Sequence, residues 1–358
     1  MEGRLKREIK EKRKFCKKKL ILAAMLLLTA CGTAGERTEQ NFEETPGREE
    51  EITEMSTEIE SAGAQSIWIT YWGQDGAEEI LAEAEEKFSK ICLFGALFDE
   101  EGKPYIHQNT LELTERLQKE DSFELYLTFV NDWVLAEGSS LKDTELLYQL
   151  FSTESGAAAH AEAILDMTEE AGFDGIEIDY ERIRSDMELW SCFRNFLEIL
   201  IDGAEERGLS LRVLLEPGIP LEELFLPEGP EYVVMCYNLH GNGTGPGPKA
   251  DEEFLISLAD KFSTLPNVGY ALANGGFFWD QEGNVESITT LEAASLAAAN
   301  EVSPVRDEAS GALYYTFQRD GETGTVWYAD GETLKRWSEI LRGRAGQETA
   351  VSIWRMNG

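Results

Sequence analysis

The stretch from Gly172 to Ile183 carries a carboxylate at every second position between Glu177 and Glu181. It reads G-F-D-G-I-E-I-D-Y-E-R-I, so Glu177, Asp179 and Glu181 alternate with Ile and Tyr residues. Successive side chains of a β-strand point to opposite faces, which places these three acids on one face. Burying neighbouring carboxylates is costly unless they are hydrogen-bonded, share a proton or face a substrate. Their titrations should couple and retain at least one proton at neutral pH, which indicates general acid catalysis.

From Ser66 onward, β-rich runs alternate with segments of helical periodicity. This alternation predicts an α/β fold, a (β/α)8 TIM barrel with a small β-hairpin insertion between strands seven and eight, at about residues 303–330. Active sites of such barrels lie at the carboxyl ends of the strands, so we expect Glu181 at the mouth and Glu177 deepest. The predicted strands are Ile67–Trp72, Ile91–Phe98, Phe123–Val130, Gly175–Glu181, Leu209–Leu215, Tyr232–Tyr237, Val268–Leu272 and Ala350–Trp354.

Three segments of this predicted barrel resemble glycoside hydrolase family 18. The segment Asp174–Glu181 (D-G-I-E-I-D-Y-E) resembles the strand-four signature of that family, Asp-Gly-x-Asp-x-Asp-x-Glu. Met235–Asn238 (M-C-Y-N) is similar to its strand-six segment Met-x-Tyr-Asp, and Ser352–Arg355 (S-I-W-R) to its strand-eight segment. The region from Asp307 to Trp354 resembles the branch that includes bacterial spore-cortex and cell-wall N-acetylglucosaminidases. The similarity covers about Ser66 to Gly358.

The resemblance implies a retaining, substrate-assisted cleavage of β-linked N-acetylglucosamine in peptidoglycan, chitin or an N-glycan. In this mechanism the acetamide of the sugar attacks its own anomeric carbon. Glu181 would be the general acid/base, Asp179 would accept from the acetamide N–H, and Tyr237 would bind the carbonyl side. Trp354 would form an apolar floor under the sugar ring. The implied reaction uses no cofactor and no metal.

Two positions depart from the family pattern. Glu177 and Asn238 each stand where the family usually has Asp, and both changes alter the charge and geometry around Glu181. They leave open a second hypothesis, a surface glycan-binding protein with weak or no catalysis. A third is an unrelated barrel hydrolase that acts on sugars without an acetamide, in which Asp179 would have a different role.

Other side chains near the predicted strand ends could contact the substrate. The full set of predicted substrate-binding residues is Glu177, Asn238, Trp354, Tyr71, Met235 and Asn131. The aromatic residues near these ends could stack on sugar or belong to the core; they are Trp72, Trp133, Phe277, Phe278 and Trp279. The polar residues there could bind sugar hydroxyls or cap loops; they are Asp132, Glu216 and His240. We expect His107 and His160 at the surface and Trp190 and Trp337 in helix packing. Three scattered histidines do not form a metal site.

The N-terminal sixty-five residues predict export and not a folded domain. Residues 1–30 join a basic run to the apolar segment Leu20–Leu28, which is typical of a signal peptide. The following Leu28–Gly32 (L-T-A-C-G) resembles the bacterial lipobox, so Cys31 would carry a lipid anchor; the alternative is an ordinary signal with a chance cysteine. Residues 31–65 read as an acidic disordered tether before a catalytic barrel at 66–358. We therefore expect an extracytoplasmic, membrane-anchored lipoprotein of a bacterial cell envelope.

The chain is strongly acidic, with a net charge of −36. Such a surface repels nucleic acid and anionic lipid, which excludes nucleic acid as a partner and leaves the lipid anchor as the attachment to the membrane. The expected partner is an N-acetylglucosamine glycan, and we expect a monomer. Cys92, Cys192 and Cys236 form neither a metal motif nor an even disulfide set, and we expect them to be buried.

Overall fold

The structure is a computed structural model that describes residues 62–83, 88–119, 122–319 and 322–358. The predicted signal peptide, Cys31 and nearly all of the predicted tether lie outside the described residues, so those predictions stay predictions. None of the helices within the described ranges combines the length and the apolar character that a bilayer-spanning helix needs.

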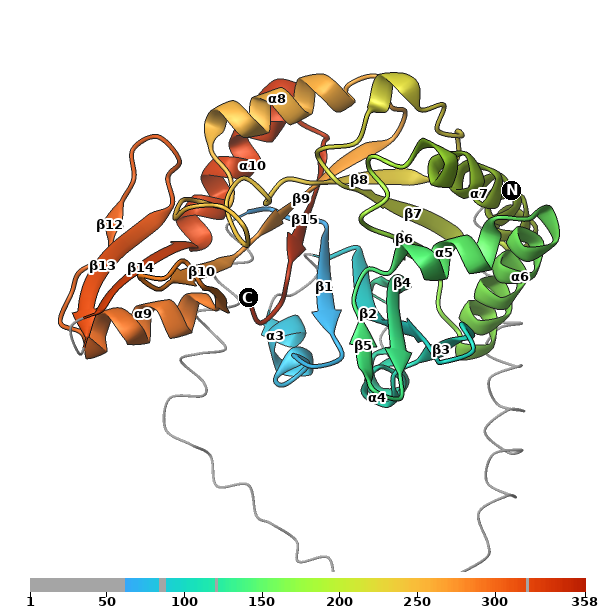
Figure 1. Ribbon diagram of the computed structural model, residues 1–358, viewed down its shortest axis with the longest axis horizontal. Helices are drawn as coiled ribbons and strands as arrows, with labels where there is room; N and C mark the ends of the chain where they lie inside the picture. The colour runs from blue at the N-terminus through green and yellow to red at the C-terminus, as the bar shows by residue number, and fades with distance from the viewer. Residues whose placement is uncertain (1–61, 84–87, 120–121, 320–321) are drawn as a thin grey trace, which may run out of the picture. The chain divides into compact units, whose positions relative to one another are not determined.

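Eight parallel strands close into a barrel (Figure 1). Around the barrel they follow the order β1, β2, β4, β6, β7, β8, β9 and β15, and β15 pairs with β1 to complete the circle. This confirms the predicted (β/α)8 fold. The strands are β1 Ser66–Thr70, β2 Lys90–Phe98, β4 Glu124–Leu135, β6 Gly175–Asp179, β7 Ser210–Leu215, β8 Glu231–Met235, β9 Val268–Ala273 and β15 Ala350–Trp354.

Helices cover the outer surface of the barrel, and α6 and α7 lie side by side beside β6 and β7 (Figure 1). Ile176 and Ile178 of β6 point to this helix layer and are fully buried. Asp186 begins α7 by accepting from Leu189 N, because the first backbone N–H groups of a helix lack partners within it. The helices are α3 Ala77–Glu83, α4 Gln108–Leu117, α5 Thr144–Phe151, α6 Glu154–Ala171, α7 Met187–Arg207, α8 Glu252–Phe262, α9 Thr290–Ala299, α10 Gly331–Ala345 and the 3-10 helix η1 Leu221–Glu223.

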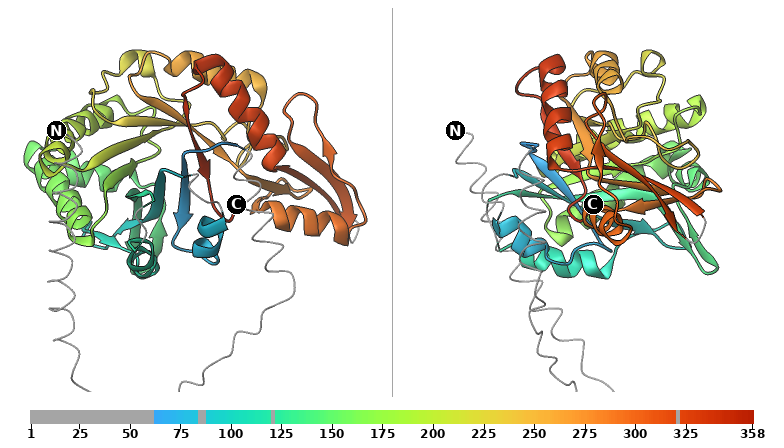
Figure 2. Two further views of the ribbon diagram at one scale, coloured as in Figure 1. Left: turned by 180° about the vertical axis from the view of Figure 1, so that it is seen from behind. Right: turned by 90° about the vertical axis from the view of Figure 1, so that its left-hand side faces the viewer.

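The insertion between β9 and β15 is larger than the sequence predicts. The hairpin of β13 and β14 is present, but it belongs to a five-stranded antiparallel sheet that stands beside the barrel together with α9 (Figure 2). The predicted start near residue 303 is therefore wrong, because β10 already pairs with β14 along its whole length. A Cβ on Gly276 would lie 1.8 Å from the carbonyl oxygen of Trp327, so only glycine allows this pairing. The strands of this five-stranded sheet are β10 Gly275–Trp279, β11 Val285–Ile288, β12 Val305–Arg306, β13 Leu313–Arg319 and β14 Glu322–Ala329. Two further short strands, β3 Pro104–Ile106 and β5 Gly138–Ser140, extend β2 and β4 at the barrel mouth.

Candidate active site

The three acids of β6 form a row from the barrel interior to its mouth. Glu177 is fully buried, the exposed fraction of Asp179 is 5%, and that of the Glu181 side chain is 13%. The row has the depth order that the sequence predicts. The predicted strand is too long, however: β6 ends at Asp179 and β8 ends at Met235. Glu181 and Tyr237 therefore lie in the loops that follow these strands.

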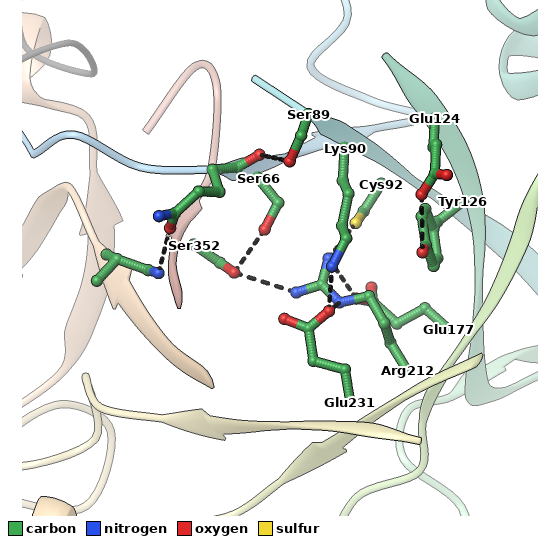
Figure 3. A network of polar contacts seen from close by, with 12 residues as sticks. Ser66, Ser89, Lys90, Cys92, Glu124, Tyr126, Glu177, Arg212, Glu231 and Ser352 are labelled. Atoms are coloured by element: carbon green, nitrogen blue, oxygen red, sulfur yellow. Dashed lines mark hydrogen bonds and ion pairs between the residues drawn. The ribbon is translucent and has the colours of Figure 1, made fainter. Parts of the chain in front are cut away.

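Glu177 belongs to the barrel core. One carboxylate oxygen accepts from Trp68 Nε1 and from Thr128 Oγ1. The other lies 3.4 Å from Arg212 Nη1 (Figure 3). Because Glu177 is fully buried beneath Asp179, it has no surface for a sugar, and the prediction that it binds substrate is wrong. Its charge is balanced by Arg212, and the hydrogen bonds from Trp68 and Thr128 satisfy its other oxygen.

Arg212 connects Glu177 to a second pair of charges deeper in the barrel (Figure 3). Its guanidinium donates to Ser352 Oγ at 3.0 Å and to Cys92 Sγ at 2.8 Å, and its Nε lies 3.6 Å from Glu231, which also pairs with Lys90. The sequence analysis did not identify this arginine. The sequence feature that could have identified it is an Arg within the apolar strand S-L-R-V-L-L, because a buried guanidinium requires an acidic partner.

Asp179 is the carboxyl of the row whose pKa is raised. Burial, and secondarily the charge of Glu181, raises the pKa of Asp179 well above that of an ordinary carboxyl. Its Oδ1 has no hydrogen-bond partner among the described residues. Burial followed by the charge of Asp179 also raises the pKa of Tyr237, which places the phenol within the electrostatic reach of this carboxyl. The raised pKa favours the protonated form of Asp179, and its Oδ1 is free for a ligand.

Asn131 binds the backbone of Glu181, and Lys142 pairs with its carboxylate. The Asn131 side chain accepts from Glu181 N at 3.0 Å and donates to Glu181 O at 3.1 Å, replacing the strand ladder that ends at Asp179. Asn131 is fully buried, so its predicted contact with sugar is wrong and it is a positioning residue. Lys142, in the loop between β5 and α5, pairs its ammonium with the Glu181 carboxylate, and Lys142 N donates to Asp132 Oδ1 at 2.8 Å. The sequence analysis missed Lys142.

An aromatic floor lies beside the acids. Trp354 packs against Phe94 and Trp68, with ring centroids 5.2 and 6.0 Å apart, and shares a cluster with Tyr237. Tyr71 packs on the same side of Trp354, against the cluster around Phe94. Met235, which the sequence predicts to bind substrate, is buried in the cluster beneath Tyr237 and Trp354. Its side chain points into the barrel at the end of β8, so Met235 supports the aromatic floor and does not reach the substrate.

Several other predicted positions serve packing. His160 is buried, not at the surface, with Nε2 2.8 Å from Tyr180 Oη, and His107 caps α4 and stacks on Tyr71. Trp190 and Trp337 are buried as predicted. Trp133 Nε1 donates to Asp99 O, Trp279 Nε1 donates to Thr244 O, and Phe278 stacks on Phe317.

The other predicted positions differ in their exposure and contacts. Glu216 accepts from Arg182 N, and Trp72 is exposed. Cys92 and Cys236 are buried, whereas Cys192 is partly exposed.

A pocket of about 520 Å³ opens beside Tyr237 and Trp354. Tyr237, Asn238 and Trp354 line one end, and Lys249 and Arg355 line the region towards the insertion. Asn238 is exposed and so is available to a ligand. The described residues contain no group of His, Cys, Asp and Glu side chains arranged to hold a metal ion. The site therefore combines a carboxyl whose pKa is raised by burial, a second carboxylate, a phenol and an indole, and the phenol and the indole also line the pocket.

The barrel, its β-rich insertion and its insertion-side pocket define a chitinase-like fold. A chitinase of Chromobacterium violaceum matches with a TM-score of 0.69 at 16% identity, covering 82% of this chain and 94% of that chain. The spore cortex-lytic enzyme of Bacillus cereus matches with 0.66 at 14%, covering 82% and 72%. A family 18 chitinase of Cycas revoluta, solved with (GlcNAc)3, matches with 0.60 at 14%, covering 82% and 95%. No family model and no curated protein matches the sequence.

Proposed function

We propose that this protein is a retaining glycosidase that cleaves β-linked N-acetylglucosamine glycans by substrate assistance. The observation that carries the proposal is the row of Asp179 and Glu181 beside Tyr237 and Trp354, at the mouth of a chitinase-like barrel. The neighbouring folds support the substrate class, since the Cycas revoluta chitinase is solved with (GlcNAc)3.

We assign a role to each group of the site. Trp354 and Tyr237 orient the sugar so that its acetamide lies over Asp179, whose Oδ1 is free to accept from the acetamide N–H. Asp179 and Glu181 hold one proton between them, and in the reactive complex this proton lies on Glu181. Glu181 transfers it to the leaving oxygen as the acetamide oxygen attacks the anomeric carbon, and ionised Asp179 stabilises the resulting oxazolinium. Water activated by Glu181 then opens the ring with net retention.

The test is Glu181→Gln, measured on chitooligosaccharides and on peptidoglycan strands. We expect kcat to fall by about a hundred- to ten-thousandfold, the usual contribution of general acid catalysis, with an unchanged circular dichroism spectrum. Proton NMR of the wild-type reaction should show the β-anomer as the first product. Unchanged turnover in Glu181→Gln, or an inverted first product, would contradict the mechanism.

A second candidate is a glycan-binding protein with weak turnover. The ion pair between Lys142 and Glu181 favours it, because the ammonium occupies the carboxylate that would have to protonate the glycosidic oxygen. Mass spectrometry of glycans incubated with the protein distinguishes the two functions. Tight binding without any product would favour the binding protein.

We further propose that lipidated Cys31 anchors the barrel, as a monomer, outside the cytoplasmic membrane. The lipobox-like sequence around Cys31 supports this, and the acidic segment before Ser66 would separate the barrel from the membrane. Metabolic labelling with a fatty acid should modify the wild type and not Cys31→Ser. Labelling of both proteins, or of neither, would contradict the anchor.

A further inference from the structure

Two cations line the pocket that Tyr237 and Trp354 also line. Lys249 comes from the loop before α8, and Arg355 follows Trp354 directly at the end of β15. Lys249 Nζ donates to the backbone oxygen of Asn274 at 2.6 Å and lies 5.3 Å from the ring centroid of Phe277. Both side chains therefore lie within the cleft that begins at the aromatic floor.

Neither cation forms an ion pair with an acid among the described residues, although Arg355 lies within electrostatic reach of Glu292. This is unusual in a chain with 68 Asp and Glu against 32 Lys and Arg, where most buried or half-buried cations described above are paired. Burial, and then the charge of Arg355, lowers the pKa of Lys249 to about 7, and burial lowers the pKa of Arg355. The two charges are thus held close together in a poorly solvated place, and the charge of Glu292 offsets only part of the cost at Arg355.

A third donor in the same wall lacks an acceptor. Asn274 is almost fully buried, its Oδ1 accepts from Arg355 N at 3.0 Å, and this contact directs Nδ2 away from Arg355 N. Nδ2 has no hydrogen-bond partner in the described part of the chain. A buried donor without an acceptor costs free energy, which a bound acceptor would recover.

Two acidic groups border the pocket but are engaged elsewhere. Glu292 accepts from Thr289 N at 2.8 Å in the capping box of α9, and Gly358 O accepts from Thr290 N at 3.1 Å. Neither forms an ion pair with Lys249 or Arg355. The site therefore combines two cations and an amide, and it lacks the anion that would complete it.

We propose that Lys249, Arg355 and Asn274 form an anion subsite that binds a carboxylate on the glycan. The inference rests on the proposed function and narrows its substrate from neutral chitin to an acidic N-acetylglucosamine polymer. Arg355 adjoins Trp354, so the carboxylate belongs to the sugar on the aromatic floor or to its neighbour. The lactyl ether of N-acetylmuramic acid carries such a group when its peptide has been removed. The reaction that supplies this substrate is therefore hydrolysis of the amide bond between the lactyl group and the peptide.

The test compares four substrates of matched length with the wild-type protein. These are peptide-free peptidoglycan strands, strands that retain one alanine, strands whose carboxylates are capped as methylamides, and chitooligosaccharides. We expect the highest kcat/KM for peptide-free strands, about ten- to a hundredfold above the methylamide strands, as for loss of a hydrogen-bonded charge. The highest value for the alanine strands would place the carboxylate on the peptide instead and still support the subsite.

Arg355→Gln and Lys249→Gln should lower the ratio of kcat/KM on acidic strands to that on methylamide strands by about tenfold each. Lys335→Gln is the matched control, because Lys335 is exposed on α10 and its substitution changes the net charge equally. If the wild type cleaves none of the four substrates, the proposed function fails. If it cleaves them with a ratio near one, or if the two variants leave the ratio unchanged, the anion subsite is refuted and the glycosidase stands.

Discussion

Replacing Arg212 by Met tests whether Glu177 is held as a buried, charge-compensated carboxylate. The substitution keeps most of the side-chain volume and removes the cation from between Glu177 and Glu231. Removing one partner of a buried ion pair costs about 3–5 kcal/mol. Glu177 would keep its hydrogen bonds from Trp68 and Thr128, so we expect a loss near the lower limit, about 3 kcal/mol.

The double variant Glu177→Gln/Arg212→Met is the control that makes this prediction specific. The neutral amide that replaces the Glu177 carboxylate leaves no uncompensated charge at this position, and Glu231 keeps its partner Lys90 in both variants. We therefore expect the double variant to be more stable than Arg212→Met alone, and we expect a coupling free energy of about 1–2 kcal/mol between the two positions. Glu177→Gln alone should be milder than Arg212→Met, because Arg212 retains Glu231 at 3.6 Å.

Chemical denaturation followed by circular dichroism measures these differences in the free energy of unfolding. Equal stability of wild type and Arg212→Met would refute the reasoning. So would a double variant whose loss equals the sum of the two single losses, because independent effects leave no coupling between Glu177 and Arg212.

Three further predictions concern positions around the site. Burial raises the pKa of Asp179 and the charge of Lys142 opposes this effect, so in Lys142→Gln the alkaline limit of the pH profile of kcat/KM should move to higher pH; an unmoved profile would contradict this. Asn131→Ala should lower kcat more than it raises KM, because it removes two hydrogen bonds that hold the Glu181 backbone; a change in KM alone would indicate that Asn131 contacts substrate. Burial lowers the pKa of His160 to about 3, below the unfolded value of about 6.5, so the folded state loses stability as pH falls below 6.5. Between pH 6.5 and 5 the loss should be about 2 kcal/mol in the wild type and smaller in His160→Gln, and equal slopes for the two proteins would contradict burial of the neutral imidazole.

The barrel and the acid row could be predicted because both depend on short-range periodicity. Alternation with period two places Glu177, Asp179 and Glu181 on one face whatever the partner strands are. The succession of strands and helices leaves few topologies for parallel strands. The strand limits were less certain, because a strand ends where its neighbour stops pairing: β6 ends at Asp179, and the backbone of Glu181 pairs with the Asn131 side chain instead.

The partners of these acids depend on the tertiary structure alone. Closure of the barrel brings Arg212 of β7 to Glu177, and the loop after β5 brings Lys142 to Glu181. In the same way, the joining of β10 to β14 sets the true size of the insertion. The sequence by itself determined which groups could do chemistry and on which face they lie. Only the folded chain decided which of them is paired with a cation, which has a raised pKa and which cations of the described residues lack an ion pair, because burial and charge proximity arise from contacts between segments far apart in the sequence.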